Sequence, residues 1–252
     1  MKKIVLSALI IISQSVLIAQ NDNQLKVTEL TFLVDITDNE LFRQIKTDFE
    51  QNLPTFFQAT GLGKIKDLEK FTVKIAPINA TGELILTSRS ISIPKKGLAL
   101  QEVKKLQNPQ PLMFMLRQQL NVYDSIRVIN NERSFIIDIV LKTIAQANES
   151  AERNVIVVLS DLLEYSPVAN FYKKIPSNQE IEEVLKKIDP TVLNQAKNKI
   201  KSGCDPEMVI VFKQAPGFKT GAELKRAWTS LLNKIGITTV VFIDNFTQNP
   251  QI

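Results

Sequence analysis

Short apolar runs alternate with longer segments of helical periodicity along most of this chain, and no other feature constrains its fold as strongly. The runs at 30–34, 154–159 and 208–212 are apolar except for Thr31 and Asn154, which is typical of parallel strands buried on both faces. Further strands are predicted at 71–78, 83–87 and 237–243. Helical periodicity predicts helices at 40–57, 99–120, 134–148, 179–200 and 221–235. This order predicts a doubly wound α/β fold with a mostly parallel sheet.

One connection in this pattern is short enough for a hairpin. The turn-forming residues 79–82 lie between the predicted strands 71–78 and 83–87, and no helical segment separates the two. We therefore expect one antiparallel strand at the edge of the parallel sheet.

The composition excludes several classes of site. The chain has no histidine and one cysteine, Cys204, so it cannot contain a Ser-His-Asp or Cys-His nucleophile pair, an intramolecular disulfide or a thiolate metal cluster. Its 252 residues, 44% of them hydrophobic, suffice for one α/β domain with a sizeable core. The net charge of +5 is spread without a basic block, so nothing points to a nucleic-acid partner.

The amino terminus has the pattern of a secretory signal peptide. Two lysines follow Met1, residues 4–12 are almost wholly apolar, and Ala19 precedes a polar stretch. An uncleaved membrane anchor is disfavoured because polar residues interrupt a stretch already too short to span a bilayer comfortably. We expect a signal peptide at 1–20 and a single exported domain at 21–252. This domain would be periplasmic or secreted, with no stable membrane insertion after cleavage.

Aspartates follow three of the predicted strands: Asp35, Asp161 and Asp244. In doubly wound sheets, ligands bind beyond the carboxyl ends of the strands, where the strand order reverses. This edge is therefore the expected place of a binding site. Alternatively, Asp35 and Asp161 could each serve only as an N-cap that accepts hydrogen bonds from the first backbone N–H groups of a helix.

Residues 32–39 (FLVDITDN) resemble the first strand and metal loop of a von Willebrand factor A domain. In that family an Asp-x-Ser-x-Ser motif ends the first strand, and its acid and two hydroxyls face a divalent cation. The matching positions here are Asp35, Thr37 and Asn39. Residues 157–161 (VVLSD) resemble the strand that supplies the family's distant aspartate, here Asp161. The order of elements also agrees over about 27–246.

The resemblance implies a divalent cation at this edge of the sheet. The family's separate threonine has no clean counterpart, and Ser134 is the hydroxyl offered in its place. The implied metal ligands are then Asp35, Thr37, Asn39, Ser134 and Asp161. Oxygen ligands without imidazole or thiolate suit Mg²⁺, with Mn²⁺ as a substitute. Alternatively, Arg133 could take the place of the cation by pairing with Asp35 or Asp161.

The function that the resemblance implies is that of an exported, non-catalytic module that engages a protein partner through the cation. One alternative is a Mg²⁺-dependent phosphohydrolase of the haloacid dehalogenase type, whose first strand also ends in an aspartate. That motif requires a second acid two residues later, where this chain has Thr37, so the general acid is missing. A structural subunit with the same fold and no metal is the other alternative. We expect no enzymatic activity.

Overall fold

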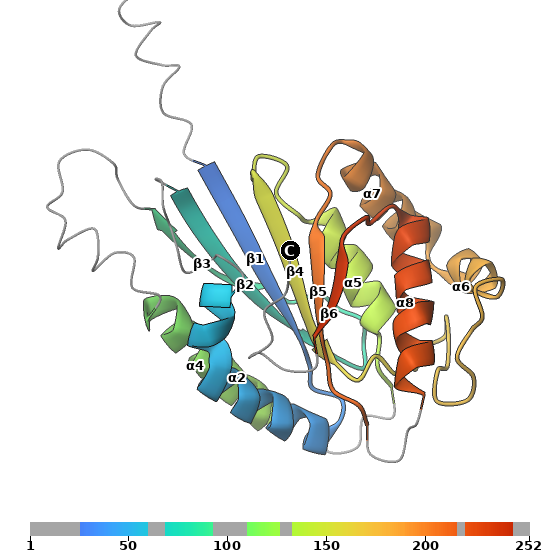
Figure 1. Cartoon of the computed structure of the whole chain (residues 1–252), viewed down its shortest axis with the longest axis horizontal. Coiled ribbons are helices and arrows are strands. Elements are labelled where there is room, and N and C mark those ends of the chain that lie inside the picture. The colour runs from blue at the N-terminus through green and yellow to red at the C-terminus, as the bar shows by residue number, and fades with distance from the viewer. Residues whose placement is uncertain (1–25, 60–68, 93–109, 127–132, 216–219, 244–252) are drawn as a thin grey trace, which may run out of the picture.

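The computed structural model describes residues 26–59, 69–92, 110–126, 133–215 and 220–243, and these contain a six-stranded sheet (Figure 1). Its strands are β1 Lys26–Asp35, β2 Glu69–Ile78, β3 Thr87–Ser92, β4 Arg153–Ser160, β5 Glu207–Phe212 and β6 Val240–Ile243. Across the sheet the order is β3-β2-β1-β4-β5-β6. β3 pairs antiparallel with β2, and every other pair is parallel. The predicted doubly wound sheet with an antiparallel edge strand is confirmed.

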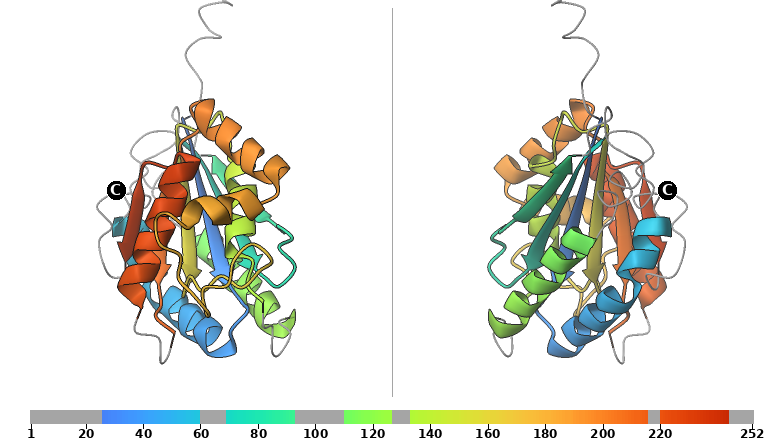
Figure 2. Two further views of the ribbon diagram at one scale, coloured as in Figure 1. Left: turned by 90° about the vertical axis from the view of Figure 1, so that its right-hand side faces the viewer. Right: turned by 90° about the vertical axis from the view of Figure 1, so that its left-hand side faces the viewer.

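Helices cover both faces of the sheet. These helices are α2 Asn39–Ala59, α4 Gln110–Ile126, α5 Ile136–Ala145, α6 Ile181–Lys187, α7 Pro190–Lys201 and α8 Gly221–Ile235. The first two lie together on one side of the molecule and the other four on the opposite side, as the two views of Figure 2 show.

Successive residues of the inner strands point to opposite faces, and both faces are buried. Phe32 and Val34 of β1 pack into the cluster formed with α2 and α4, whereas Leu33 packs into the cluster formed with α5 to α8. Val157 and Val158 of β4 divide between the two clusters in the same way. The uninterrupted apolar runs of the sequence arise because each strand must fill two cores at once.

The prediction of a strand at 83–87 is wrong, because the second strand of the hairpin is β3. The side chain of Asn79 makes hydrogen bonds within the intervening loop. Its Oδ1 accepts hydrogen bonds from the N–H groups of Thr81 and Gly82, and its Nδ2 donates to the carbonyl of Glu83. Leu84 and Leu86 then pack against the core from this loop. Their apolar character reflects loop packing and not strand pairing.

The prediction of a single helix at 179–200 is also wrong, because the chain forms α6 and α7 there. Pro190 has no N–H to donate and occupies the first turn of α7, where none is required. Asp189 caps that turn, since its Oδ1 accepts the N–H of Thr191 at 2.7 Å.

Other boundaries shift by a few residues. The last strand begins at Val240 and not at 237, and the helix predicted at 99–120 is α4 from Gln110 onward. Its first part, the predicted signal peptide and Asp244 lie outside the described residues. Within the described ranges, no helix has both the length and the apolar character needed to cross a bilayer.

Candidate functional site

The order of strands reverses between β1 and β4, which lie side by side at the centre of the sheet. Asp35 is the last residue of β1, Ser160 is the last residue of β4, and Asp161 follows directly. The hydroxyl of Ser160 donates a hydrogen bond to Oδ2 of Asp35 at 2.7 Å, which joins the two strand ends. The edge that the sequence predicts as a binding site is therefore a connected group of polar side chains.

Asp35 is almost completely buried, with 1% of its surface exposed. Its Oδ1 accepts hydrogen bonds from the N–H and the hydroxyl of Thr37, at 3.0 and 2.6 Å. Burial raises the pKa of Asp35, although these bonds and that from Ser160 oppose the shift. The helix cap of α2 is a different residue: Oδ1 of Asp38 accepts the N–H of Leu41 at 2.7 Å. Asp35 is thus held by its own loop and by β4.

Asp161 is buried beside Asp35 and is 4% exposed. Its Oδ1 accepts the N–H of Leu163 at 2.9 Å, within a loop and not at the start of a helix. Burial, and next the charge of Asp35, raise the pKa of Asp161 to about 7. Two buried carboxylates, one of which raises the pKa of the other, form a place where a bound cation would relieve the repulsion.

Ser134 lies at the same edge, held between the ends of two strands. Its N–H and C=O exchange hydrogen bonds with the C=O and N–H of Tyr165, which follows β4, at 3.0 and 2.9 Å. The next residue, Phe135, donates its N–H to the carbonyl of Asn79, which follows β2, at 3.3 Å. Since β1 lies between β2 and β4, this segment crosses the sheet edge beside Asp35. The hydroxyl of Ser134 is buried, and among the described residues it has no hydrogen-bond partner.

Among the described residues, no hydrogen bond or ion pair ties Asn39 or Arg133 to the two aspartates. Asn39 is the first residue of α2 and is half-buried, and within the described ranges no hydrogen bond links it to Asp35 or Asp161. Arg133 is exposed, and no ion pair between it and either aspartate is present in that part of the chain. The structure therefore shows no pairing that would put Arg133 in the place of a cation.

Sequence reasoning gave no role to two residues of this edge. Ser160 links Asp35 to the loop after β4, because its hydroxyl oxygen also accepts the N–H of Leu162 at 2.9 Å. Glu164 is fully buried, and its Oε2 accepts the N–H of Ile137 at 2.9 Å. Burial raises the pKa of Glu164 to about 8. In the sequence, Glu164 could have been noticed as an acidic residue next to the apolar residues that follow a buried strand.

The donor set fits a hard divalent cation. Within the described residues no three acidic or thiol side chains gather around one point, so a site here must combine two carboxylates with hydroxyls. Asp35, Asp161 and Thr37 supply such oxygens, and the buried, unpartnered hydroxyl of Ser134 is one more. Mg²⁺ and Mn²⁺ accept oxygen ligands of this kind and retain waters in their remaining positions.

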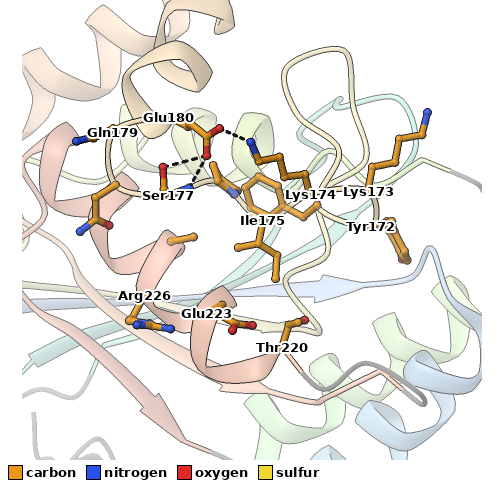
Figure 3. Close-up of a pocket in the computed structure, with 14 residues that line it drawn as sticks. Tyr172, Lys173, Lys174, Ile175, Ser177, Gln179, Glu180, Thr220, Glu223 and Arg226 are labelled. Carbon is orange, nitrogen blue, oxygen red and sulfur yellow. Dashed lines mark hydrogen bonds and ion pairs between the residues drawn. The ribbon is translucent and has the colours of Figure 1, made fainter.

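A pocket of about 850 Å³ lies between the loop 171–180 and the first turns of α8. Figure 3 shows Ile175 pointing from the loop toward Thr220 and Glu223 on the opposite wall. Lys174 pairs with Glu180 along the loop side of the pocket.

Tyr172 lines this pocket, and the charges of the aspartates act on its hydroxyl. Partial burial, and then the negative charges of Asp161, Asp35 and Asp38, raise the pKa of the Tyr172 hydroxyl, so this side chain lies within electrostatic reach of the site. Tyr172 also stacks edge-to-face with Tyr165, with ring centroids 6.2 Å apart. A ligand bound at the sheet edge would have the pocket as neighbouring surface.

No protein-family model matches the chain, and no curated protein matches it in sequence. Among solved structures, it is similar to the pilus adhesin SpaC from Lactobacillus rhamnosus GG in an open conformation, with 12% identity and a TM-score of 0.46 over 89% of this chain and 28% of that chain. A second structure of SpaC gives 11% identity and a TM-score of 0.45, with 89% and 29% covered. The human COPII-coat protein Sec24c gives 11% and 0.40, with 88% and 30% covered. The chain spans less than a third of these proteins, and at such TM-scores the likeness carries no argument about function.

Proposed function

We propose that this protein is a non-catalytic binding module that holds Mg²⁺ between the ends of β1 and β4 and uses it to engage a protein partner. The observation that supports this most is the pair of buried carboxylates, Asp35 and Asp161, with the buried, unpartnered hydroxyl of Ser134 on a segment at the same edge of the sheet. An arrangement of this kind is costly without a counter-charge, because burial and the charge of Asp35 both oppose ionisation of Asp161.

In the proposed site, Asp35 and Asp161 supply the negative charge, and Thr37 and Ser134 supply neutral oxygens. The resemblance to von Willebrand factor A domains adds the amide oxygen of Asn39. When bound, the cation supplies an electrophilic centre for an oxygen of the partner, such as a carboxylate. Tyr172 and the pocket beside it offer the partner further surface.

The residue two positions after Asp35 favours binding over catalysis. The general acid that a phosphohydrolase of the haloacid dehalogenase type needs two residues later is absent, since that position is Thr37. We therefore propose no enzymatic activity, and expect no hydrolysis of a generic aryl phosphate in the presence of Mg²⁺.

The amino-terminal pattern supports export of the module. The proposed location is periplasmic or secreted, with cleavage near Ala19. The partner is identified only by its chemistry, as a protein that presents an oxygen ligand to the cation.

Melting curves with and without cation test the metal site. Mg²⁺ or Mn²⁺ should stabilise the wild type by about 2.7 kcal/mol at a hundredfold excess over Kd, and EDTA should reverse the effect. Asp161→Asn should abolish the response. Asp189→Asn is the matched control, because Asp189 also accepts the N–H of the residue two positions later but lies on the surface. A wild type that does not respond to either cation would leave the metal-free structural subunit as the better proposal.

A further inference from the structure

The loop after β4 is fastened at three points, and this determines where the site residues lie. Trp228 of α8 donates its Nε1–H to the carbonyl of Leu162 at 3.0 Å. Phe171 donates its N–H to the carbonyl of Glu164 at 2.8 Å, which closes the loop on itself. Tyr165 pairs with Ser134 through two backbone hydrogen bonds. The loop therefore connects the end of β4 to the segment that carries Ser134.

Glu164 adds a fourth attachment, to the beginning of α5. Its Oε2 accepts the N–H of Ile137, the second residue of that helix, although the two residues are 27 positions apart. Phe135, which precedes the first residue of α5, is in the N-cap position and offers no side-chain hydrogen bond. Glu164 thus supplies from the β4 loop the acceptor that an N-cap side chain usually provides.

Ser134 lies between these two attachments. On one side its backbone is bonded to Tyr165, and three residues later the chain is bonded to the side chain of Glu164. Because Glu164 and Tyr165 are neighbours on the loop that begins with Asp161, one short hydrogen-bonded segment connects Asp161 to the backbone of Ser134.

We propose that Glu164 is a positioning residue for the metal site, which holds the Ser134 hydroxyl toward Asp35 and Asp161 without touching the cation itself. The inference rests on the proposed function, since it gives Ser134 a role as ligand. Partners in this outer shell of a metal site typically contribute 10–100-fold to affinity. Burial raises the pKa of Glu164 to about 8, which agrees with a side chain that acts through its shape and its hydrogen bond and not through a charge.

The test compares Mn²⁺ affinities of full-length variants by titration calorimetry. Glu164→Met fills a similar volume but accepts no hydrogen bond, and should weaken Mn²⁺ binding about 10–100-fold. Glu164→Gln keeps an acceptor oxygen for the N–H of Ile137 and should bind Mn²⁺ as the wild type does. Should Glu164→Met not fold, Glu164→Asp, which is one methylene too short to reach Ile137, replaces it.

A double-mutant cycle separates positioning from a general loss of order. If Glu164 acts through Ser134, then Glu164→Met should weaken binding no further once Ser134→Ala has removed the hydroxyl. Ile144→Val, at the far end of the same helix, is the control for loss of stability alone and should leave the affinity unchanged. In the metal-free protein, amide exchange at Ile137 should accelerate in Glu164→Met and not in Glu164→Gln.

The outcomes are distinguishable. Unchanged Mn²⁺ affinity in Glu164→Met, or full additivity with Ser134→Ala, overturns the positioning role and leaves the proposed function intact. A wild type that binds no Mn²⁺ overturns both, whatever the exchange rate at Ile137.

Discussion

Replacing Asp161 by asparagine should make the metal-free protein more stable at alkaline pH. The carboxylate of Asp161 is buried next to Asp35, and burial together with the charge of Asp35 raises its pKa to about 7 from an ordinary value of 3.8. An asparagine at this position retains an oxygen that can accept the N–H of Leu163, so the substitution removes the charge and keeps the hydrogen bond. The gain in stability would measure the cost of burying that charge.

The sign and size follow from proton linkage. A group whose pKa is higher in the folded state contributes stability that is fully present below its unfolded pKa and is lost as pH rises through its folded pKa. For Asp161 this window runs from about pH 4 to about pH 7. At 1.36 kcal/mol per pH unit the full effect is about 4 kcal/mol, and because Asp35 shares the repulsion we expect about 2–4 kcal/mol.

Urea unfolding in EDTA provides the measurement. Trp228 is the single tryptophan of the chain and is buried, so its fluorescence reports unfolding. Asp161→Asn should match the wild type within about 1 kcal/mol at pH 4 and exceed it at pH 8.5. Asp189→Asn, on the surface, should change stability by less than about 0.5 kcal/mol at either pH. If Asp161→Asn is no more stable than the wild type at pH 8.5, then burial and the charge of Asp35 do not disfavour the ionised form of Asp161.

Three further substitutions test other parts of the fold. Glu164→Gln should reduce the loss of stability between pH 5 and pH 8, since burial raises the pKa of Glu164 to about 8 and the folded state favours the neutral acid. A free energy of urea unfolding that falls with pH as steeply as in the wild type would contradict this. Trp228→Phe should destabilise by about 1–3 kcal/mol because the carbonyl of Leu162 loses its buried donor, as thermal unfolding followed by circular dichroism would show. Gly236→Ala should destabilise by about 1–2 kcal/mol, because Gly236 ends α8 at φ +116°; denaturant midpoints equal to those of the wild type would refute the strain.

The sequence predicted the sheet because each central strand fills two cores. Residues 154–159 have no polar face, and this leaves few structures other than a doubly wound sheet. The strand-end rule then identified Asp35 and Asp161, because parallel strands end at the same edge. The break at Pro190 was also visible as an Asp-Pro pair, but the continuing periodicity of 179–200 concealed it.

What the sequence could not predict depends on contacts between distant segments. The apolar residues of 83–87 satisfy a strand pattern and a packed loop equally well. In the structure the loop is formed, with hydrogen bonds from the Asn79 side chain and with Leu84 and Leu86 against the core. Likewise, the capping of α5 by Glu164 joins residues whose proximity follows from the paths of two loops. The hydrophobic pattern of a short segment does not show which distant residues it will contact.

The central position of β1 has a consequence for how the chain folds as it is made. The bond between Ser160 and Asp35 joins residues 125 positions apart, and β1 lacks its β4 neighbour until residues 153–160 have been synthesised. At common rates of translation this delay is on the order of 10 s. Throughout that interval β1 has at least one unpaired edge and two incompletely covered apolar faces. A chain in this state exposes apolar surface and an unpaired strand edge, the two features that make incompletely folded species prone to aggregate.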